Sequence, residues 1–356
     1  MSGEEQLSLA DIFRRLIRTS GPISVAHFMA ESNARYYAGR DPLGTAGDFI
    51  TAPEISQMFG ELIGLWLADM WIRAGRIEPP HYVELGPGRG TLAKDALRTM
   101  KRYGLEPFVH FVETSPSLRK LQYDAVPDAE FHDDLSTVPD DGPMLLVANE
   151  FLDALPVRQL VRTADGWRER MVGLDADENL TFVSGSQPMD SAVPPDRHEA
   201  SEGTIIETCP AAAAIVYEIA GRLALQDGAA LLIDYGHADG RAGTTLQAVK
   251  AHKSVDPLSA PGEADLTALV DFATLARVAQ SRDARWLGTE TQGDWLRSLG
   301  IETRAENLAY RAPHYRQELE AARDRLIADD QMGQLFKVMG LASQRWPQGV
   351  GFGSED

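Results

Sequence analysis

Cysteine is almost missing from this chain of 356 residues, since Cys209 is its single thiol. One cysteine cannot close an internal disulfide, so a disulfide-stapled secreted fold is excluded and a reducing compartment is expected. Cysteine and histidine residues also do not cluster along the sequence at the spacing of a metal site. We therefore expect no metal.

Long apolar runs are missing as well. No stretch approaches the length of a membrane span, and Met1 to Leu9 is polar and acidic, unlike a targeting segment. These absences predict a cytoplasmic protein with no membrane insertion.

Basic residues are in deficit, with 34 Lys and Arg against 53 Asp and Glu, a formal net charge of −19. Such a charge argues against a broad surface for nucleic acid or for anionic membranes. It suits a basic partner, such as an arginine-bearing polypeptide, although solubility alone explains it equally well. A G-x-S-x-G elbow is also missing, so Ser/His/Asp hydrolysis has little support.

The most informative stretch that is present runs from Val83 to Thr91, Val-Glu-Leu-Gly-Pro-Gly-Arg-Gly-Thr. Residues 82–85 predict a short buried strand, and residues 92–98 predict a helix. A strand, a tight glycine turn and a helix form the first unit of a nucleotide-binding α/β sheet.

The glycine spacing narrows the choice of ligand. Gly86, Gly88 and Gly90 alternate with other residues, and Thr91 stands where a dinucleotide-binding turn wants its third glycine. Glu84 comes two positions before the turn and would repel a pyrophosphate but attract a cation. S-adenosylmethionine carries an ammonium and a sulfonium and no phosphate, so the motif fits that cofactor better than NAD. The residues assigned to it here are Glu84, Gly86, Pro87, Gly88 and Gly90.

Three further strands are predicted at 108–112, 129–132 and 144–148, alternating with helices. This alternation predicts a mainly parallel sheet with right-handed crossovers, which binds ligands beyond the carboxyl ends of its strands. Each strand ends in polar side chains that should meet at one edge. The polar residues are Glu113, Thr114 and Ser115, then Asp133 and Asp134 with the apolar Leu135 after them, then Asn149 and Glu150.

The residues at these strand ends are predicted to contact the ribose and the adenine of the cofactor. Glu113 is placed to accept both ribose hydroxyls, although it could be a surface acid before a helix that Ser115 caps. Asp134 could accept from the adenine amino group while Leu135 packs on the ring, and Asp133 competes for that role. Thr114, Ser115 and Asn149 are assigned to the same cofactor site.

The stretch Asn149 to Pro156 is expected to hold the methyl acceptor. Carboxylates can bind a guanidinium, because arginine presents a planar fork of five donors. Glu150 and Asp153 are therefore the candidate catalytic residues, acting by positioning and by local negative potential. Alternatively, Asp153 caps the next turn and Glu150 tethers a loop.

The flanking sequence suggests five segments. A loop from Tyr36 to Ile50 precedes a capping box in which Thr51 is the N-cap and Glu54 its partner. Short antiparallel strands predict a small β insertion, and Val249 to Lys253 is either a substrate-facing arm or a surface loop. The predicted segments are 1–75 (helical and cofactor-covering), 76–156 (first half of the core), 157–204 (β insertion), 205–346 (second half of the core) and 347–356 (tail).

Three blocks, Gly47 to Gln57, Glu84 to Gly90 and Asn149 to Pro156, resemble the MidA-like family of S-adenosylmethionine-dependent methyltransferases, whose mitochondrial members are assembly factors of respiratory complex I. The resemblance implies a class I methyltransferase fold, Rossmann-like, with helices on both faces of a mainly parallel sheet, an N-terminal helical segment and a small β insertion. It also implies N-methylation of a protein arginine on a core subunit of NADH:ubiquinone oxidoreductase.

By the same analogy the loop from Tyr36 to Thr51 would fold over the cofactor. Asp48 and Thr51 are then further cofactor contacts. The residues assigned to the substrate are Tyr36, Tyr37, Tyr235 and His252. A small-molecule methyltransferase and a non-catalytic assembly scaffold are the alternatives, and the sequence leaves open whether the chain forms a homodimer.

Overall fold

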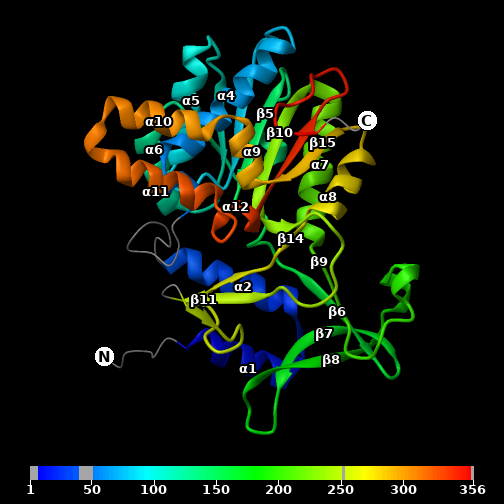
Figure 1. Ribbon diagram of the computed structural model, residues 1–356. Helices are drawn as coiled ribbons and strands as arrows, with labels where there is room; N and C mark the ends of the chain where they lie inside the picture. Colours follow the sequence, from blue (N-terminus) through cyan, green and yellow to red (C-terminus); the bar gives the residue numbers. More distant parts are fainter. Residues whose placement is uncertain (1–6, 40–50, 251–252, 354–356) are drawn as a thin grey trace. The chain divides into compact units, whose positions relative to one another are not determined.

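The computed structural model describes residues 7–39, 51–250 and 253–353 (Figure 1). The chain divides into two compact units, each built from three stretches of sequence. The first unit comprises Met1–Arg40, Asp153–Ala212 and Gly240–Leu269, and the second comprises Asp41–Leu152, Ala213–Asp239 and Val270–Asp356. The N-terminal helices, the β insertion and the predicted arm thus share a unit, a grouping that differs from the five predicted segments.

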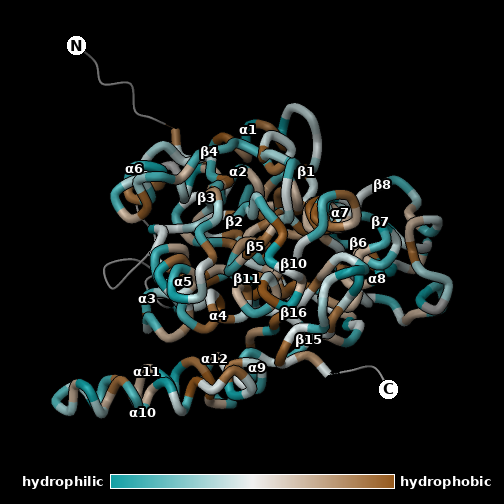
Figure 2. Tube along the Cα trace, turned by 90° about the horizontal axis from the view of Figure 1, so that it is seen from above, coloured by the Kyte–Doolittle hydropathy of each residue, from teal (hydrophilic) through white to brown (hydrophobic). Residues whose placement is uncertain are grey.

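A mixed sheet forms the centre of the second unit, with strand order β15-β16-β10-β5-β2-β3-β4. Figure 2 shows the strands following one another in this order. Strands β10, β5, β2, β3 and β4 are parallel to one another, and β16 is antiparallel to both β10 and β15. The strands are β2 (His81–Leu85), β3 (Phe108–Val112), β4 (Glu130–His132), β5 (Met144–Asn149), β10 (Gly228–His237), β14 (Val270–Asp271, beside β10), β15 (Arg285–Thr291) and β16 (Phe336–Ala342).

Helices cover both faces of this sheet, as predicted. The helices α4, α5 and α6 lie on one face and α7 and α8 on the other (Figure 1). The sheet needs both layers because β2 and β5 are buried along their whole length and β10 is buried over residues 228–234, the pattern of a parallel sheet covered on both faces. The helices are α3 (Ala52–Ile55), α4 (Gln57–Arg73), α5 (Thr91–Arg102), α6 (Pro116–Ala125), α7 (Pro210–Gln226), α8 (Phe272–Gln280), α9 (Gln292–Ser298), α10 (Ile301–Arg311), α11 (Arg316–Ile327) and α12 (Met332–Leu335).

Two antiparallel sheets and two helices form the first unit. Strands β1-β7-β6-β9 are adjacent, with β8 paired to β7, and β12-β11-β13 form a second sheet. The apolar faces of α1 and α2 pack into a separate core with residues of these strands. The elements are α1 (Leu9–Ser20), β1 (Ile23–Ser24), α2 (Val25–Gly39), β6 (Arg158–Thr163), β7 (Gly166–Leu174), β8 (Leu180–Pro188), β9 (Ile205–Thr208), β11 (Gln247–Lys250), β12 (Lys253–Val255) and β13 (Asp265–Thr267).

Three local predictions need correction. The loop predicted from Tyr36 onward is helical at its start, because α2 continues through Gly39. Thr51 is the N-cap of α3 but makes no side-chain cap, and Glu54 instead accepts a hydrogen bond from Thr91 Oγ1. The long helix begins afresh at Ser56, whose hydroxyl accepts from the Met58 amide at 3.2 Å. No helix among the described residues is long and apolar enough to cross a bilayer.

Candidate functional site

The carboxyl ends of four parallel strands lie in register in the second unit. Leu85 pairs with Val112 on β3 and with Ala148 on β5, and Val112 pairs with His132 on β4. The polar residues that follow each strand therefore begin at one sheet edge, as predicted. Because β2 precedes both its neighbours in the chain, this edge is a topological switch point, where open α/β sheets bind ligands.

The glycine turn after β2 requires its glycines. Gly86, Gly88 and Gly90 have φ angles of 61°, 55° and 77°, in the left-handed region that favours glycine. A Cβ added to Gly86 would lie 2.7 Å from Phe151 Cδ2, so a side chain there would clash as well. The Gly90 amide donates to the Pro87 carbonyl at 2.8 Å, which closes the turn directly before α5.

Glu84 is buried at this edge, and its environment disfavours its charge. Burial raises the pKa of the Glu84 carboxyl to about 7, against the opposing effect of the Tyr82 hydroxyl. That hydroxyl donates to Glu84 Oε2 at 2.6 Å. A cationic ligand beside Glu84 would favour the ionised form, because an opposite charge lowers the pKa of an acid.

Glu113 is held with both carboxylate oxygens in hydrogen bonds. Its Oε1 accepts from the Ser115 amide at 2.8 Å, and its Oε2 accepts from Gln122 Nε2 at 3.2 Å. Gln122 Nε2 also donates to the Gly88 carbonyl at 2.8 Å. The buried Gln122 thus links the glycine turn to the acid after β3, a role that its place within a predicted helix did not reveal.

The two acids after β4 have different partners. Asp133 forms an ion pair with Arg119 at 2.6 Å and its side chain is largely exposed. Asp134 accepts from the Ser136 amide at 2.7 Å, and hydrogen bonding by the side chain and the amide of Ser136 lowers the pKa of Asp134. Leu135, which follows, is buried. Asp134 is therefore fixed beside an apolar residue, whereas Asp133 is committed to an arginine.

The segment after β5 is held by a residue that we did not assign from the sequence. Asp234, at zero exposure on β10, accepts from the amides of Phe151 and Leu152 at 3.1 and 2.8 Å, and from its neighbour Tyr235 at 2.8 Å. An acid at the end of the apolar run 229–233 is the sequence signal that could have identified it. Asp234 fixes the chain directly after Glu150.

Glu150 occupies a strained position at this edge. Its φ angle is 51°, unusual for a residue with a side chain, and its amide donates to the Ile233 carbonyl at 2.9 Å. Glu150 Oε1 accepts from the Ala52 amide at 3.1 Å and from Asn149 Nδ2 at 3.2 Å. Non-glycine residues in such conformations gather at functional sites, where the surroundings impose them.

The other predicted site residues lie elsewhere or outside the description. Asp153, Tyr36 and Tyr37 belong to the first unit, where the Tyr37 hydroxyl donates to Asp265 at 3.0 Å. Burial raises the pKa of Tyr37. Tyr235 stacks on Phe336 in the second unit, with ring centroids 3.9 Å apart. Thr51 precedes α3, Thr114 is exposed in the turn after β3, and Asp48 and His252 lie outside the described residues.

Together these residues of the second unit fit S-adenosylmethionine. The glycine turn after β2 lets a ligand approach the backbone closely, because its glycines have no side chains. Glu84 favours a nearby cation, and the carboxylate of Glu113 is held in place by hydrogen bonds. Asn149 Oδ1 is buried with no hydrogen-bond partner among the described residues, so a donor from a ligand would satisfy it.

Comparison with known proteins identifies the same cofactor. A family model described as S-adenosyl-L-methionine-dependent methyltransferase (Methyltransf_28) matches residues 62–289. The mitochondrial protein arginine methyltransferases NDUFAF7 of mouse and human are 39% and 38% identical, over 91% and 94% of this chain and 82% and 83% of theirs. The Drosophila melanogaster homologue is 36% identical over 94% of this chain and 84% of its own.

Two solved structures have a similar fold. A COG1565 superfamily member from Burkholderia thailandensis, bound to S-adenosyl-homocysteine, superposes with a TM-score of 0.82 at 26% identity and covers 96% of this chain and 93% of its own. A native structure of a COG1565 superfamily protein from the same organism superposes with a TM-score of 0.83 at 28% identity and covers 98% of this chain and 94% of its own. These matches confirm the predicted family resemblance, the α/β methyltransferase fold and the cofactor.

Proposed function

This chain belongs to the Methyltransf_28 family of S-adenosyl-L-methionine-dependent methyltransferases, and from that premise we propose that it methylates a terminal nitrogen of an arginine in a protein. Two lines of support lead to arginine. Relatives more than a third identical over most of their length are named protein arginine methyltransferases. The predicted acceptor edge also carries a carboxylate, the group that binds a guanidinium best.

The observation that carries the proposal is the placement of Glu150. Its left-handed backbone costs about 1 kcal/mol, which the hydrogen bonds of its amide and carboxylate offset. Glu150 follows β5 at the switch point, next to the glycine turn that follows β2. We assign to its carboxylate the binding of the acceptor guanidinium. Asp153 stays a predicted second carboxylate.

The cofactor contacts are proposed to follow the strand ends. Glu84 and the turn Gly86 to Gly90 bind the cationic amino-acid portion, and Glu113 accepts the ribose hydroxyls. Asp134 accepts from the adenine amino group while Leu135 packs on the ring. This choice over Asp133 is supported by the ion pair of Asp133 with Arg119.

Transfer then depends on positioning and charge. S-adenosylmethionine supplies an electrophilic methyl group on a sulfonium when it is bound. Glu150 would hold two nitrogens of the guanidinium and orient the third toward that methyl, which replaces an encounter in solution by a fixed approach. The new N–C bond would form as the sulfur–methyl bond breaks, which leaves S-adenosylhomocysteine as the neutral thioether. The methylated nitrogen would then release one proton to water, and the Glu150 carboxylate would stabilise the positive charge until that release.

The protein substrate is proposed to be a core subunit of NADH:ubiquinone oxidoreductase, with symmetric dimethylarginine as the product. The family resemblance supports this, and the net charge of −19 suits a basic acceptor segment. Methylation would then assist assembly of that complex. A cytoplasmic location stays an expectation from the sequence.

The test uses purified protein with labelled S-adenosylmethionine and a lysate, followed by mass spectrometry for methylarginine. We expect Glu150→Gln to bind the cofactor within about threefold of the wild type and to lose about a hundredfold or more in methyl transfer. The matched control is Glu106→Gln, which changes an exposed acid paired with Lys101.

The outcomes separate the alternatives. Methyl transfer by the wild type to small molecules alone would overturn the protein substrate, and no transfer despite cofactor binding would favour an assembly scaffold. If Glu150→Gln and Glu106→Gln transfer methyl groups equally fast, Glu150 does not hold the acceptor.

A further inference from the structure

Three histidines from adjacent strands form one hydrogen-bonded row in the second unit. His81 on β2 contacts His110 on β3 through Nδ1 and Nε2 at 3.0 Å, and His110 Nδ1 contacts His132 Nε2 on β4 at 3.1 Å. His81 and His110 are buried, and His132 is half-buried. Parallel pairing brings them together although they are 29 and 22 residues apart along the chain, which is why the sequence showed no cluster.

Each end of the row faces an acceptor. His132 Nδ1 lies 2.9 Å from Thr137 Oγ1, and the hydroxyl of Thr137 donates to the Asp134 carbonyl at 3.0 Å, so its oxygen is left to accept. At the other end, His81 Nε2 is buried without an aligned hydrogen bond, yet Asp141 Oδ1 is 3.0 Å away. A carboxylate oxygen at that distance requires a protonated nitrogen, since two acceptors repel each other.

Counting protons shows that the neutral row is one proton short. Two ends and two ring-to-ring contacts need four protons, whereas three neutral imidazoles carry three. Suppose that the three protons lie at the two ends of the row and between His81 and His110. Nδ1 of His110 and Nε2 of His132 then face each other as two lone pairs. A fourth proton, or a cation, must lie between them.

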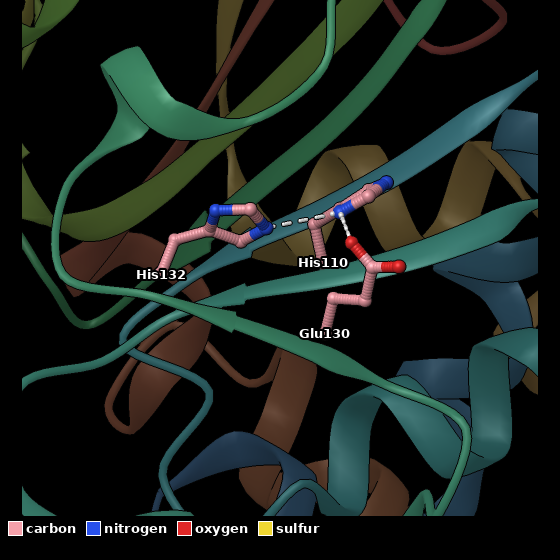
Figure 3. A group of neighbouring side chains, drawn as sticks. All are labelled: His110, Glu130 and His132. Carbon is pink, nitrogen blue, oxygen red and sulfur yellow. Dashed lines mark hydrogen bonds and ion pairs between the residues drawn. The ribbon is translucent and has the colours of Figure 1, made fainter.

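A carboxylate approaches this same point. Glu130 Oε2 is 3.7 Å from His110 Nδ1, and one ligand atom from each of His110, Glu130 and His132 lies within 4.8 Å of the others (Figure 3). We propose that a divalent zinc-type cation binds here, held by His110 Nδ1, His132 Nε2 and the Glu130 carboxylate, with water as the fourth ligand. Tetrahedral zinc with bonds of about 2.1 Å separates its ligand atoms by about 3.4 Å, between the two distances observed.

The groups behind the ligands suit the same assignment. With the cation in place, His110 Nε2 donates to His81, His81 Nε2 faces Asp141, and His132 Nδ1 donates to Thr137. Every proton then has an acceptor, the arrangement by which outer groups orient metal-binding imidazoles.

The location suggests what the cation would do. Strand β4 is the outermost strand of the sheet beside β3, and the turn with Asp134 and Leu135 follows His132 directly. Ligands from both strands would fix β4 on β3. The cation is thus a structural one that steadies the edge of the proposed adenine site.

The test is zinc binding by tag-free full-length protein stripped with a chelator, measured by calorimetry without S-adenosylmethionine. We expect one ion per chain, and a tetrahedral visible spectrum when cobalt replaces zinc. The variants His132→Gln and Glu130→Gln change side chains near the surface and should weaken binding, by about a hundredfold and about tenfold respectively. His314→Gln, an exposed histidine, is the matched control and should bind as the wild type does.

Two results would overturn the proposal. One is the absence of zinc binding at micromolar concentrations, and the other is equal affinity in His132→Gln and His314→Gln. Either would leave the row as a hydrogen-bonded chain with an added proton or with Thr137 turned to donate. Because no cofactor is present, failure here is separate from failure of the methyl-transfer proposal.

Discussion

Glu84 shows how a side chain can serve a ligand at the expense of the fold. Its carboxyl has a pKa raised to about 7 by burial, whereas an unfolded chain has the ordinary value of 4.5. Between those values the folded state holds a proton that the unfolded state has lost. Stability therefore falls as pH rises from about 4.5 to about 7, and stays lower above that.

Glu84→Gln should remove the stability cost of ionising Glu84 and should also weaken cofactor binding. The variant keeps an acceptor for the Tyr82 hydroxyl, so without cofactor it should be more stable than the wild type by about 1–3 kcal/mol at pH 8, with little difference at pH 4.5. Its affinity for S-adenosylmethionine should be low throughout. The wild type should bind more weakly as pH falls below 7, by up to about tenfold per unit.

Denaturant unfolding and calorimetry across pH 4.5 to about 8 check both parts. A stability difference that does not change with pH would show that Glu84 is ionised without penalty. Equal cofactor affinity in the two proteins would remove it from the site.

At the residue scale, the sequence located those groups whose position follows from the local chain. The glycines after β2 and the acids after β3 and β5 occupy motif positions that are contiguous in sequence. Gln122 and Asp234 were not assigned from the sequence, because their hydrogen-bond partners lie on other elements. These partners are Gly88, Phe151 and Leu152. The predicted capping box did not form, because Glu54 accepts a hydrogen bond from Thr91, which lies on another helix.

At the scale of elements, the segment after β5 is shaped by its connection to β10. Asp234 supplies acceptors to backbone amides of that segment, and Phe151 lies against Gly86 in the turn after β2. Loosening the segment should therefore disturb the glycine turn. One carboxylate on β10 thus fixes the segment after β5, which contacts the glycine turn at the switch point.

Asp234→Asn should lose stability and cofactor affinity together. The amide has one acceptor oxygen and turns a donor toward backbone N–H groups, which costs about 1–3 kcal/mol. Affinity for S-adenosylmethionine should fall by about tenfold. The control is Asp227→Asn before the other end of β10, where the acid accepts from Ser343 and Arg345; it should lose stability alone. Unchanged cofactor affinity in Asp234→Asn would disprove the coupling.

Elements were predicted best where one periodicity dominates. The apolar runs at 144–148 and 229–233 marked β5 and β10, and the alternation of strands and helices fixed the sheet as mainly parallel. The strands β11 and β12 were expected as an arm or loop. They form a hairpin, and β11 also pairs with β13 further along the chain, which the local pattern did not reveal.

At the scale of the whole molecule, local sequence patterns do not predict which distant segments pack into one unit. The first unit draws on residues 1–40, 153–212 and 240–269, and only tertiary packing joins them. The total charge, in contrast, is fully determined by composition. It makes a prediction about association that needs no detail of the site.

A net charge of −19 should accelerate the encounter with a basic protein substrate. If the proposed arginine methylation is right, kcat/KM for a lysine- and arginine-rich acceptor peptide should fall about tenfold between about 0.02 M and about 0.3 M salt, because the Debye length shrinks over that range. The same acceptor arginine flanked by glutamates should react slowly at low salt and faster as salt rises. Cofactor affinity, measured alongside, should change much less than either rate. Parallel salt responses for the two peptides would show that the acidic surface does not steer the substrate and that its charge serves solubility alone.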